Sequence, residues 1–472
     1  MPVFRSAPSF IGLKLEVNTR RYRHLRVAVA VGPNGRILLK PFPGGRRSLH
    51  LLDWVCEDRI RGVVSASALM SPKQSHPIVT LKQGRDVSVR RRHPWIFSGA
   101  IAERQGTLQR GCFVEVRGKD GAVLGAGHWG TRGISVRMLS FGAVRDEEAL
   151  IHERLAAAVA LRRALGLIDN KDTSGFRLVH AEGDGLPGLV IDVYSELAVV
   201  QCHSAGMWRL REVISSYLIG SAQIGLSETI FRQVEAQMEP PQEEGGAGDQ
   251  ASDIVIPEPS RVVSFSESGL RFLADVTSGQ KTGFFLDQRV NRQKVRAYSS
   301  GKHVLNAFCY TGAFSVYAFA GGAESVVSVD ASKAAIDLCR QNVVANFASV
   351  DHHSEVADCF SYLTQIPDTF DLIVLDPPAF AKHQRAIQRG LRGYETINTL
   401  ALKKIKPGGI LVSFSCSQLI SREVFRDAVM RASVNAGRFV RVLEVLHQAP
   451  CHPTSLFHPE GEYLKGLIMV VE

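Results

Sequence analysis

A cysteine stands between two serines at the point where a predicted buried strand ends. In GGILVSFSCSQLI (408–420), Cys416 follows a run of apolar residues and precedes a polar turn. A free cysteine is most often a small buried hydrophobic residue, but a packing cysteine would normally lie inside a strand. A partly exposed thiol at a strand end can ionise and act as a nucleophile. Cys416 is therefore a candidate for covalent catalysis.

Two aspartates follow other predicted strands. VVSVD ends in Asp330, and FDLIVLDPPAF carries Asp376 directly after its apolar run. From about residue 260, near-continuous apolar strands alternate with helices, which is typical of a mostly parallel sheet covered on both faces. Ligands of such sheets bind at the carboxyl ends of the strands. We therefore expect Cys416, Asp330 and Asp376 to share one crevice.

The loop NAFCYTGAFS (306–315) follows the first strand of this region and has the composition of a ligand-binding turn. Small residues such as Thr311 and Gly312 let a ligand approach the backbone closely, although the loop lacks the G-x-G-x-x-G pattern of dinucleotide sites. Twenty residues on, Asp330 stands where an acid commonly binds ribose hydroxyls, and Asp358 is placed to reach an adenine amino group. Each acid alone is more often a loop or cap residue. The ordered set, with the DPP sequence that follows, predicts an S-adenosylmethionine site.

The DPPAF loop predicts how a base would be held. Pro377 and Pro378 fix the backbone past the strand end and remove two N–H donors. A plain loop is the simpler interpretation, but Asp376 can hydrogen-bond a ring edge and Phe380 can stack on the ring. An acid at this place suits a base whose N3 is protonated during reaction, which is cytosine. A thiolate from Cys416 adding at C6 would make C5 nucleophilic enough to take a methyl group, before the C5 proton and the thiol leave.

The composition bounds the remaining possibilities. The 472 residues predict roughly two to four domains of a globular protein. Eight scattered cysteines form no C-x-x-C pair, which predicts neither a metal site nor a disulfide framework and favours a reducing, cytoplasmic location. No run of about 18 apolar residues predicts a membrane span. The first 145 residues carry 25 Lys/Arg and 8 Asp/Glu, whereas the rest carry 31 Lys/Arg and 38 Asp/Glu. We therefore expect the basic N-terminal part to bind a polyanion, most simply nucleic acid.

The chain divides into four predicted parts. Residues 1–77 are an Arg-rich extension with weak periodicity, for which an early translation start, a transit segment and a basic tail all fit; we favour the first. Residues 78–145 predict a small β-barrel from short alternating strands and Gly-rich turns. Residues 146–260 predict a small mixed α/β domain that contains a flexible acidic loop at 238–253. Residues 261–472 predict the parallel-sheet domain.

A cluster of arginines lies beside aromatic residues in the predicted barrel. Arg90, Arg91 and Arg92 are followed closely by Trp95 and Phe97. Cations next to aromatic faces suit RNA phosphates and exposed bases. A solvated charge run beside core aromatics is the commoner arrangement, but the basic front of the chain favours RNA contact.

Seven motifs together resemble one enzyme family. They occur in order and at the right spacing, and the resemblance runs from about Ile78 to the C-terminus. The family is the bacterial methyltransferases that form 5-methylcytosine in the 23S RNA of the large ribosomal subunit. Its members combine a PUA domain, a central α/β domain and a C-terminal Rossmann-like class I methyltransferase domain. The motifs are TGFFLDQRVNR (282–292), LNAFCYTGAFSVYA, VVSVDASKAAIDLCRQN, VLDPPAFAK, RGYETIN, GGILVSFSCS and HPEGEYLKG (458–466).

The resemblance implies roles for individual residues. It makes Cys416 the nucleophile and Asp376 the residue that holds the base, with large-subunit ribosomal RNA as partner and a homodimer as the assembly. Two segments depart from the family pattern: residues 1–69 have no counterpart, and 238–253 is longer and more acidic. The implied cofactor contacts are Phe285, Gln288, Arg289, Phe308, Tyr310, Thr311, Gly312, Asp330, Asp358 and Asp376. The implied substrate contacts are Pro377, Pro378, Phe380, Arg90, Arg91 and Arg92.

Other functions fit parts of the pattern. A related enzyme that makes N2-methylguanine uses the same loop and needs no cysteine, whereas a 5-methyluridine enzyme also uses a thiol. A non-enzymatic RNA-binding or ribosome-assembly factor would bind RNA without adenosylmethionine. The intact loop, acids and thiol argue against a non-enzymatic factor. Cys416 distinguishes methylation of cytosine C5, which needs a thiol, from formation of N2-methylguanine, which does not.

Overall fold

The computed structural model describes residues 13–19, 22–31, 37–41, 76–131, 133–143, 146–233, 260–366, 370–381 and 383–472. Two compact units divide the chain, residues 1–75 and 76–472. The predicted acidic loop at 238–253 lies outside the described residues, and so does Met70, the second methionine of the chain and the alternative start that an early translation start would imply. No described helix is long and apolar enough to cross a membrane.

The first unit contains a sheet that the sequence analysis missed. Strands β1 (Leu13–Thr19), β2 (Tyr22–Val31) and β3 (Ile37–Pro41) pair antiparallel in the order β1-β2-β3. The weak periodicity expected of residues 1–77 did not predict these strands. The alternating run VAVAV in β2 is a strand signal, which the high arginine content of the region obscured.

The second unit begins with a six-stranded sheet around its own apolar core. The strand order is β5-β9-β8-β7-β4-β6, and all neighbours pair antiparallel except β4 and β7. Buried side chains from several strands, among them Val79, Val116 and Val136, fill the core. A short helix, α2 (Val87–Arg90), stands where only strands and turns were predicted. The strands are β4 (Ile78–Leu81), β5 (Trp95–Phe97), β6 (Ile101–Gln105), β7 (Phe113–Arg117), β8 (Val123–Trp129) and β9 (Ile134–Phe141).

A mixed α/β layer follows, as the sequence predicts. Its first helix, α3 (Glu147–Ala164), starts at Asp146, whose side chain accepts a hydrogen bond from the Ala149 amide as an N-cap. The helix covers a four-stranded sheet of order β10-β11-β12-β13, in which only β12 and β13 are parallel. The further elements are β10 (Gly175–His180), β11 (Leu189–Tyr194), β12 (Leu197–Cys202), α4 (Ala205–Arg209), α5 (Arg211–Gly220) and β13 (Glu228–Gln233), then the hairpin β14 (Val262–Glu267) and β15 (Leu270–Asp275).

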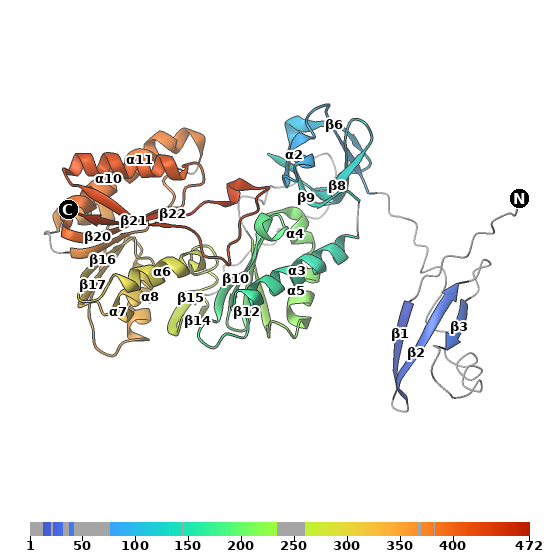
Figure 1. Cartoon of the computed structure of the whole chain (residues 1–472), viewed down its shortest axis with the longest axis horizontal. Coiled ribbons are helices and arrows are strands. Elements are labelled where there is room, and N and C mark those ends of the chain that lie inside the picture. The colour runs from blue at the N-terminus through green and yellow to red at the C-terminus, as the bar shows by residue number, and fades with distance from the viewer. Residues whose placement is uncertain are drawn as a thin grey trace, which may run out of the picture. The chain divides into compact units, whose positions relative to one another are not determined.

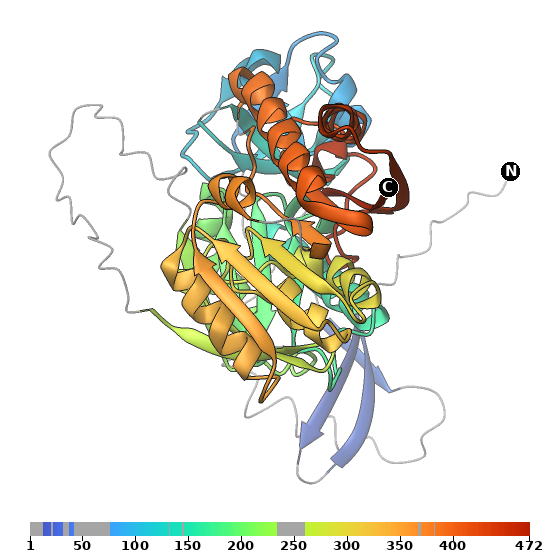
Figure 2. The same ribbon diagram turned by 90° about the vertical axis from the view of Figure 1, so that its left-hand side faces the viewer.

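The C-terminal part is a seven-stranded sheet with helices on both faces (Figures 1 and 2). The strand order is β18-β17-β16-β19-β20-β22-β21; β16 to β20 run parallel, and β22 is antiparallel to both neighbours. Helices α6, α7 and α8 lie on one side and α10 and α11 on the other (Figure 1). The strands are β16 (His303–Ala307), β17 (Ser325–Asp330), β18 (Asp351–Val356), β19 (Phe370–Leu375), β20 (Ile405–Ser415), β21 (Val440–Leu446) and β22 (Lys465–Val471). The helices are α6 (Arg289–Ala297), α7 (Ala313–Ala320), α8 (Lys333–Val344), α9 (Cys359–Gln365), α10 (Ile387–Lys404) and α11 (Arg422–Ala436).

The register of this sheet aligns the predicted site residues. Ala307 of β16 lies opposite Val329 of β17 and Leu375 of β19. The next residue on each strand therefore emerges at the same edge of the sheet, and these residues include Asp330 and Asp376. Because β20 continues two residues beyond the partner of Leu375, Cys416 emerges at this edge as well.

Candidate active site

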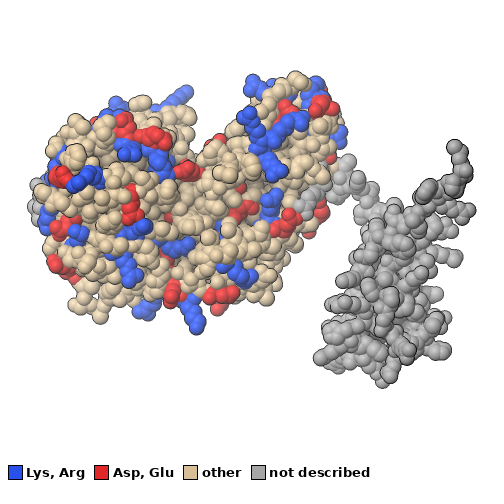
Figure 3. Space-filling view, viewed as in Figure 1, with Lys and Arg blue, Asp and Glu red and all other residues tan. Residues whose placement is uncertain are grey.

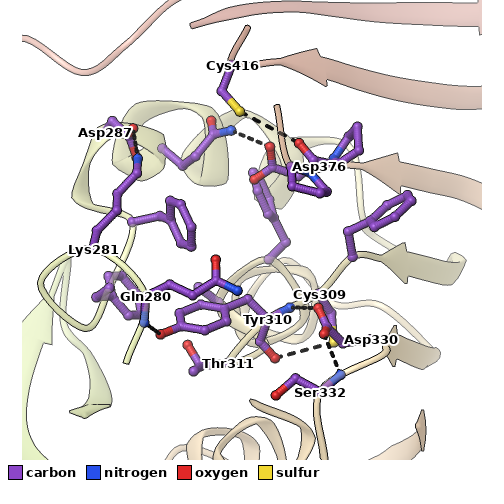
Figure 4. Close-up of a pocket in the computed structure, with 18 of the residues that line it drawn as sticks. Gln280, Lys281, Asp287, Cys309, Tyr310, Thr311, Asp330, Ser332, Asp376 and Cys416 are labelled. Carbon is purple, nitrogen blue, oxygen red and sulfur yellow. Dashed lines mark hydrogen bonds and ion pairs between the residues drawn. The ribbon is translucent and has the colours of Figure 1, made fainter. Parts of the chain in front are cut away.

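A cavity of about 470 Å³ opens at the carboxyl edge of the parallel strands. Figure 4 shows Cys416 and Asp376 at one end and Asp330 and Ser332 at the other. The sequence-predicted residues that line it are Phe285, Gln288, Phe308, Tyr310, Thr311, Asp330, Asp358, Asp376, Pro377, Pro378 and Cys416. Of the site residues predicted in the C-terminal part, Arg289, Gly312 and Phe380 do not line it. Lining residues that the sequence analysis did not single out include Gln280, Lys281, Asp287, Arg292 and Ser332.

The three predicted residues outside the cavity have structural contacts. Arg289 is buried at the start of α6, and its charge lowers the pKa of Cys451, which burial raises. The Phe380 ring packs against the Tyr394 ring, with the centroids 4.7 Å apart and the ring planes tilted by 46°. Gly312 caps α7 with φ of 77°, where an added Cβ would lie 2.2 Å from the sulfur of Cys339. Only glycine fits that position.

The loop after β16 is held in a strained conformation. Phe308 and Tyr310 have φ of 59° and 47°, in the left-handed region that non-glycine residues rarely adopt. Such strain costs on the order of 1 kcal/mol or more at each residue and concentrates at ligand sites. The Tyr310 hydroxyl is fixed by the backbone N–H of Gln280, which donates to it at 3.0 Å. The buried Thr311 hydroxyl has no hydrogen-bond partner among the described residues, which leaves a polar atom for a ligand.

Two acids on the far side of the cavity retain free acceptor capacity. Asp330 accepts hydrogen bonds from the backbone amides of Tyr310 and Ser332, both at 2.9 Å, one on each carboxylate oxygen. Each oxygen has a second lone pair, which can accept from ribose hydroxyls. Asp358 is the N-cap of α9, and one oxygen accepts from the Ser361 amide and hydroxyl at 2.9 and 3.0 Å. Its other oxygen can accept from an exocyclic amine.

The thiol at the other end is fixed from several sides. Cys416 Sγ lies 3.8 Å from the Pro377 carbonyl oxygen, to which it donates. The next residue, Ser417, has its hydroxyl 2.9 Å from the Tyr394 hydroxyl, and the Lys465 ammonium donates to the Ser417 carbonyl at 2.7 Å. Burial raises the pKa of the Cys416 thiol to about 11, partly offset by the positive charge of Lys281. The thiol is therefore positioned to react but needs a proton acceptor.

Asp376 has an unusual proton affinity. Burial raises its pKa to about 7, and the negative charge of Asp287 adds to this effect. Gln288 donates to the carboxyl Oδ1 at 3.0 Å, and Asn291 holds Gln288 in turn at 2.6 Å. A carboxyl with a pKa near neutrality can both take up and release a proton.

A second buried acid stays ionised beside the first. Burial opposes ionisation of Asp287, but the charge of Lys281 and the hydrogen bond from Tyr463 outweigh it and lower its pKa to about 2. Lys281 Nζ lies 2.9 Å and the Tyr463 hydroxyl 2.5 Å from Asp287 Oδ2. Lys281 also has a φ of 51° and lies over the Phe285 ring at 4.4 Å. The cavity thus holds a permanent ion pair next to the acid that titrates.

The three predicted arginines lie elsewhere, at α2 and just after it. Arg90 pairs with Asp86 at 2.6 Å and with Asp120 at 3.2 Å. Arg91 and Arg92 are exposed. None of the three lines the cavity.

Comparisons with known proteins identify the family. A model described as S-adenosylmethionine-dependent methyltransferase matches residues 245–455, and a PUA-like domain model matches residues 79–141. Ribosomal RNA large subunit methyltransferase I of Aeromonas hydrophila is 40% identical over 402 residues, which cover 83% of this chain and 98% of the relative. The enzyme of the same name from Shewanella amazonensis is 41% identical over 401 residues, with the same coverage. The chain belongs to the ribosomal RNA large subunit methyltransferase I family.

Solved structures agree on the fold of this family member. A structure from Streptococcus mutans assigned to the SAM-dependent methyltransferases is 19% identical with a TM-score of 0.67, over 83% of this chain and 99% of that one. Another methyltransferase, solved with SAH, is 20% identical with the same TM-score and coverage. The predicted Rossmann-like methyltransferase fold, the PUA-like domain and the S-adenosylmethionine cofactor are therefore confirmed. The free acceptors of Asp330 and Asp358 and the unpartnered Thr311 hydroxyl fit this cofactor.

Proposed function

We propose that this enzyme methylates C5 of a cytosine in the RNA of the large ribosomal subunit, through a transient bond between Cys416 Sγ and C6 of the base. The names of relatives about 40% identical over nearly their whole length support the RNA class. The same names do not specify a base, so the choice of cytosine rests on the site. The basic front of the chain supports a polyanionic partner.

The observation that carries the proposal is the pairing of a thiol with a proton-carrying carboxyl in one cavity. Cys416 and Asp376 directly follow neighbouring strands, β20 and β19, and both line the cavity. The ionised Asp376 raises the pKa of the thiol, so the two groups interact electrostatically. Between them they can hold one proton, on sulfur or on the carboxyl.

The proton transfers at Sγ and at N3 in the proposed reaction are assigned to Cys416 and Asp376. Cys416 gives its proton to Asp376 as the Sγ–C6 bond forms, and Asp376 passes the proton to N3, which neutralises the charge that develops on the ring. Bound S-adenosylmethionine supplies the sulfonium methyl group that C5 attacks. Loss of the C5 proton to a base, and then of Sγ from C6 with the N3 proton returning through Asp376 to the thiolate, restores the enzyme. Lys281 favours the thiolate throughout by its charge.

The proton on Asp376 also favours cytosine over uracil. Cytosine N3 is an acceptor, whereas uracil N3 carries its own hydrogen and would need an acceptor in its place. A carboxyl with a pKa of about 7 can take the proton from the Cys416 thiol and then donate it to cytosine N3. An acid with the ordinary value near 3.8 would seldom hold that proton.

The test is a trapping experiment. Tritiated S-adenosylmethionine is incubated with large-subunit RNA carrying 5-fluorocytosine and with wild type, Cys416→Ala or Cys112→Ala as a matched control outside the cavity. Fluorine at C5 cannot leave as a proton, so the expected result is a denaturation-resistant protein–RNA adduct in wild type and in Cys112→Ala, but not in Cys416→Ala. Nucleoside mass spectrometry of unsubstituted RNA should show 5-methylcytidine.

Other outcomes would contradict the proposal in distinct ways. Methylated RNA without an adduct in any protein would indicate methylation of an amine, as on N2 of guanine. Formation of 5-methyluridine would agree with Cys416 as the nucleophile but show that the methylated base is uracil and not cytosine. RNA binding without transfer of the tritiated methyl group would indicate a non-enzymatic RNA-binding factor.

Location and assembly belong to the same proposal. An enzyme of ribosomal RNA would act in the cytoplasm. A homodimer stays a prediction that sedimentation of the purified protein would check.

A further inference from the structure

Two thiols with no part in the proposed reaction lie together at the cofactor loop (308–312), which joins β16 to α7. Cys309 belongs to this loop and lines the catalytic cavity beside Asp330 (Figure 4), whereas Cys339 lies on α8 and is completely buried. The two cysteines pack with Ile336 in a small apolar cluster. Their thiols are also hydrogen-bonded to each other.

A histidine and a serine from neighbouring strands lie close to the inner thiol. His352 Nε2 on β18 is 3.9 Å from Cys339 Sγ and 2.9 Å from Ser328 Oγ on β17. The hydrogen bond with Cys309 and the contact with His352 lower the pKa of Cys339 to about 5, although burial opposes this. Burial and the neighbouring thiol raise the pKa of Cys309 well above its ordinary value. The pair therefore holds its proton on Cys309, with Cys339 as the thiolate.

The sulfur of Cys339 packs directly against the cofactor loop. A Cβ added at Gly312 would lie 2.2 Å from this sulfur, so no atom separates it from the loop backbone. The same loop holds Phe308 and Tyr310 in the left-handed region, and the Tyr310 N–H donates to Asp330. Strained backbone of this kind persists only while the surrounding contacts fix it. A new bond at the sulfur of Cys339 would therefore change the loop that holds the cofactor.

We propose that Cys309 and Cys339 are a site of oxidative modification, where hydrogen peroxide joins the two sulfurs in a disulfide that lowers the affinity for S-adenosylmethionine. The sulfur atoms of a disulfide are ~2.0 Å apart, well inside the contact distance of separate sulfurs. Formation of the bond therefore pulls the cofactor loop toward α8 and displaces Tyr310 from Asp330. The inference rests on the cofactor and not on which base is methylated.

The reaction needs peroxide as its only co-reactant. The Cys309 proton passes to Cys339 as the Cys309 sulfur attacks one peroxide oxygen, the O–O bond breaks, and hydroxide leaves a sulfenic acid on Cys309. The Cys339 sulfur then attacks the Cys309 sulfur, and its proton leaves with the sulfenic hydroxyl as water. The two sulfurs lose two electrons, which the peroxide gains. Thiol, thiolate and peroxide thus become disulfide, water and hydroxide.

A small uncharged oxidant fits the approach to this site. The cavity through which peroxide reaches Cys309 is lined by charges of both signs, including the Lys281–Asp287 ion pair and Asp330. Lys and Arg are also interspersed with Asp and Glu over the visible face of the C-terminal part (Figure 3), so this face does not attract oxidants of one charge. Bound S-adenosylmethionine would occupy the same cavity, so we expect the cofactor to protect Cys309 from peroxide.

Treatment of the full-length protein with hydrogen peroxide, followed by calorimetry with SAH, tests the inference. The Kd for SAH should rise about tenfold or more in wild type, as expected for the loss of one or two hydrogen bonds, and dithiothreitol should restore it. Mass spectrometry of a tryptic digest should show a disulfide between peptides 303–333 and 334–340, each of which carries one of the two cysteines. Saturating SAH during the treatment should prevent this link.

Alanine variants separate this pair from the other thiols. Cys309→Ala and Cys339→Ala should each have the same SAH affinity before and after peroxide. Cys112→Ala is the matched control, because Cys112 lies outside the cavity, and it should respond like wild type. Cys416→Ala should also respond like wild type, which excludes oxidation of the nucleophile as the cause. The melting temperature of each untreated variant checks its folding, and Cys339→Ser is a second variant that keeps a small polar side chain.

Three results would overturn the inference. The first is an unchanged Kd for SAH in peroxide-treated wild type. The second is a loss of affinity in both alanine variants, which would assign the effect to another thiol. The third is a disulfide that joins Cys309 to Cys359 and not to Cys339. Because SAH binding does not depend on the methylated base, these results are independent of the trapping experiment that tests the cytosine reaction.

Discussion

Replacing Asp376 with asparagine should stabilise the protein while it removes activity. The folded protein raises the pKa of this carboxyl from 3.8 to about 7, so the folded state binds the proton more tightly than the unfolded state. Stability contributed by the protonated carboxyl is full below pH 3.8 and is lost as pH rises to about 7. Above that window the buried carboxylate costs about 4 kcal/mol. Asparagine keeps an acceptor for the Gln288 amide and removes this cost.

Thermal unfolding of wild type and Asp376→Asn at several pH values measures the effect. The stability gain should be small near pH 4, intermediate at pH 5 and close to its full value at pH 8.5. Asp371→Asn is the opposite control: burial opposes ionisation of Asp371, but the His303 amide and Lys406 lower its pKa, so this variant should lose stability above pH 4. An Asp376→Asn protein no more stable than wild type at pH 8.5 would refute the reasoning, and so would retained methylation of cytosine.

Three further changes probe the same cavity. Lys281→Met removes the charge that favours the Cys416 thiolate and should lower kcat/KM at least tenfold at pH 7.5, with partial recovery at higher pH; unchanged SAH affinity by calorimetry would exclude a folding defect. The wild-type kcat/KM should fall about tenfold per pH unit below pH 7, because Asp376 is then protonated and cannot accept the thiol proton; initial rates from pH 5.5 to 9 check this, and a flat profile would contradict it. Gly312→Ala should weaken SAH binding and lower the melting temperature, since its Cβ would meet the Cys339 sulfur at 2.2 Å; wild-type values would contradict the clash.

The reactive residues at strand ends could be predicted from the sequence because the fold places them by rule. Parallel strands end at one edge of a sheet, so recognising three apolar strands was enough to bring Asp330, Asp376 and Cys416 together. The location of these three side chains could be predicted without knowing how the loops and helices pack.

The ion pair could not be predicted in the same way. Lys281 lies before β16, the first strand of the sheet in the chain, Asp287 lies in a 3₁₀ turn, and Tyr463 comes 176 residues after Asp287, between β21 and β22. Their meeting depends on how three loops pack, for which periodicity gives no signal. The same holds for Phe457, which lines one groove with Arg91 and Phe97, more than 300 residues earlier in the chain.

Asp287 explains why two neighbouring carboxyls have such different proton affinities. Its own pKa is about 2 because Lys281 and Tyr463 hold it ionised against burial, and its charge then helps to raise the pKa of Asp376, after burial, to about 7. Environments that separate two acids in this way assign one as the proton carrier and the other as a fixed charge. In Asp287→Asn the acid limb of the kcat/KM profile should therefore move to lower pH, because Asp376 loses its negative neighbour while Lys281 keeps its charge. A purely structural role for Asp287 would lower the rate at every pH and leave the limb near pH 7.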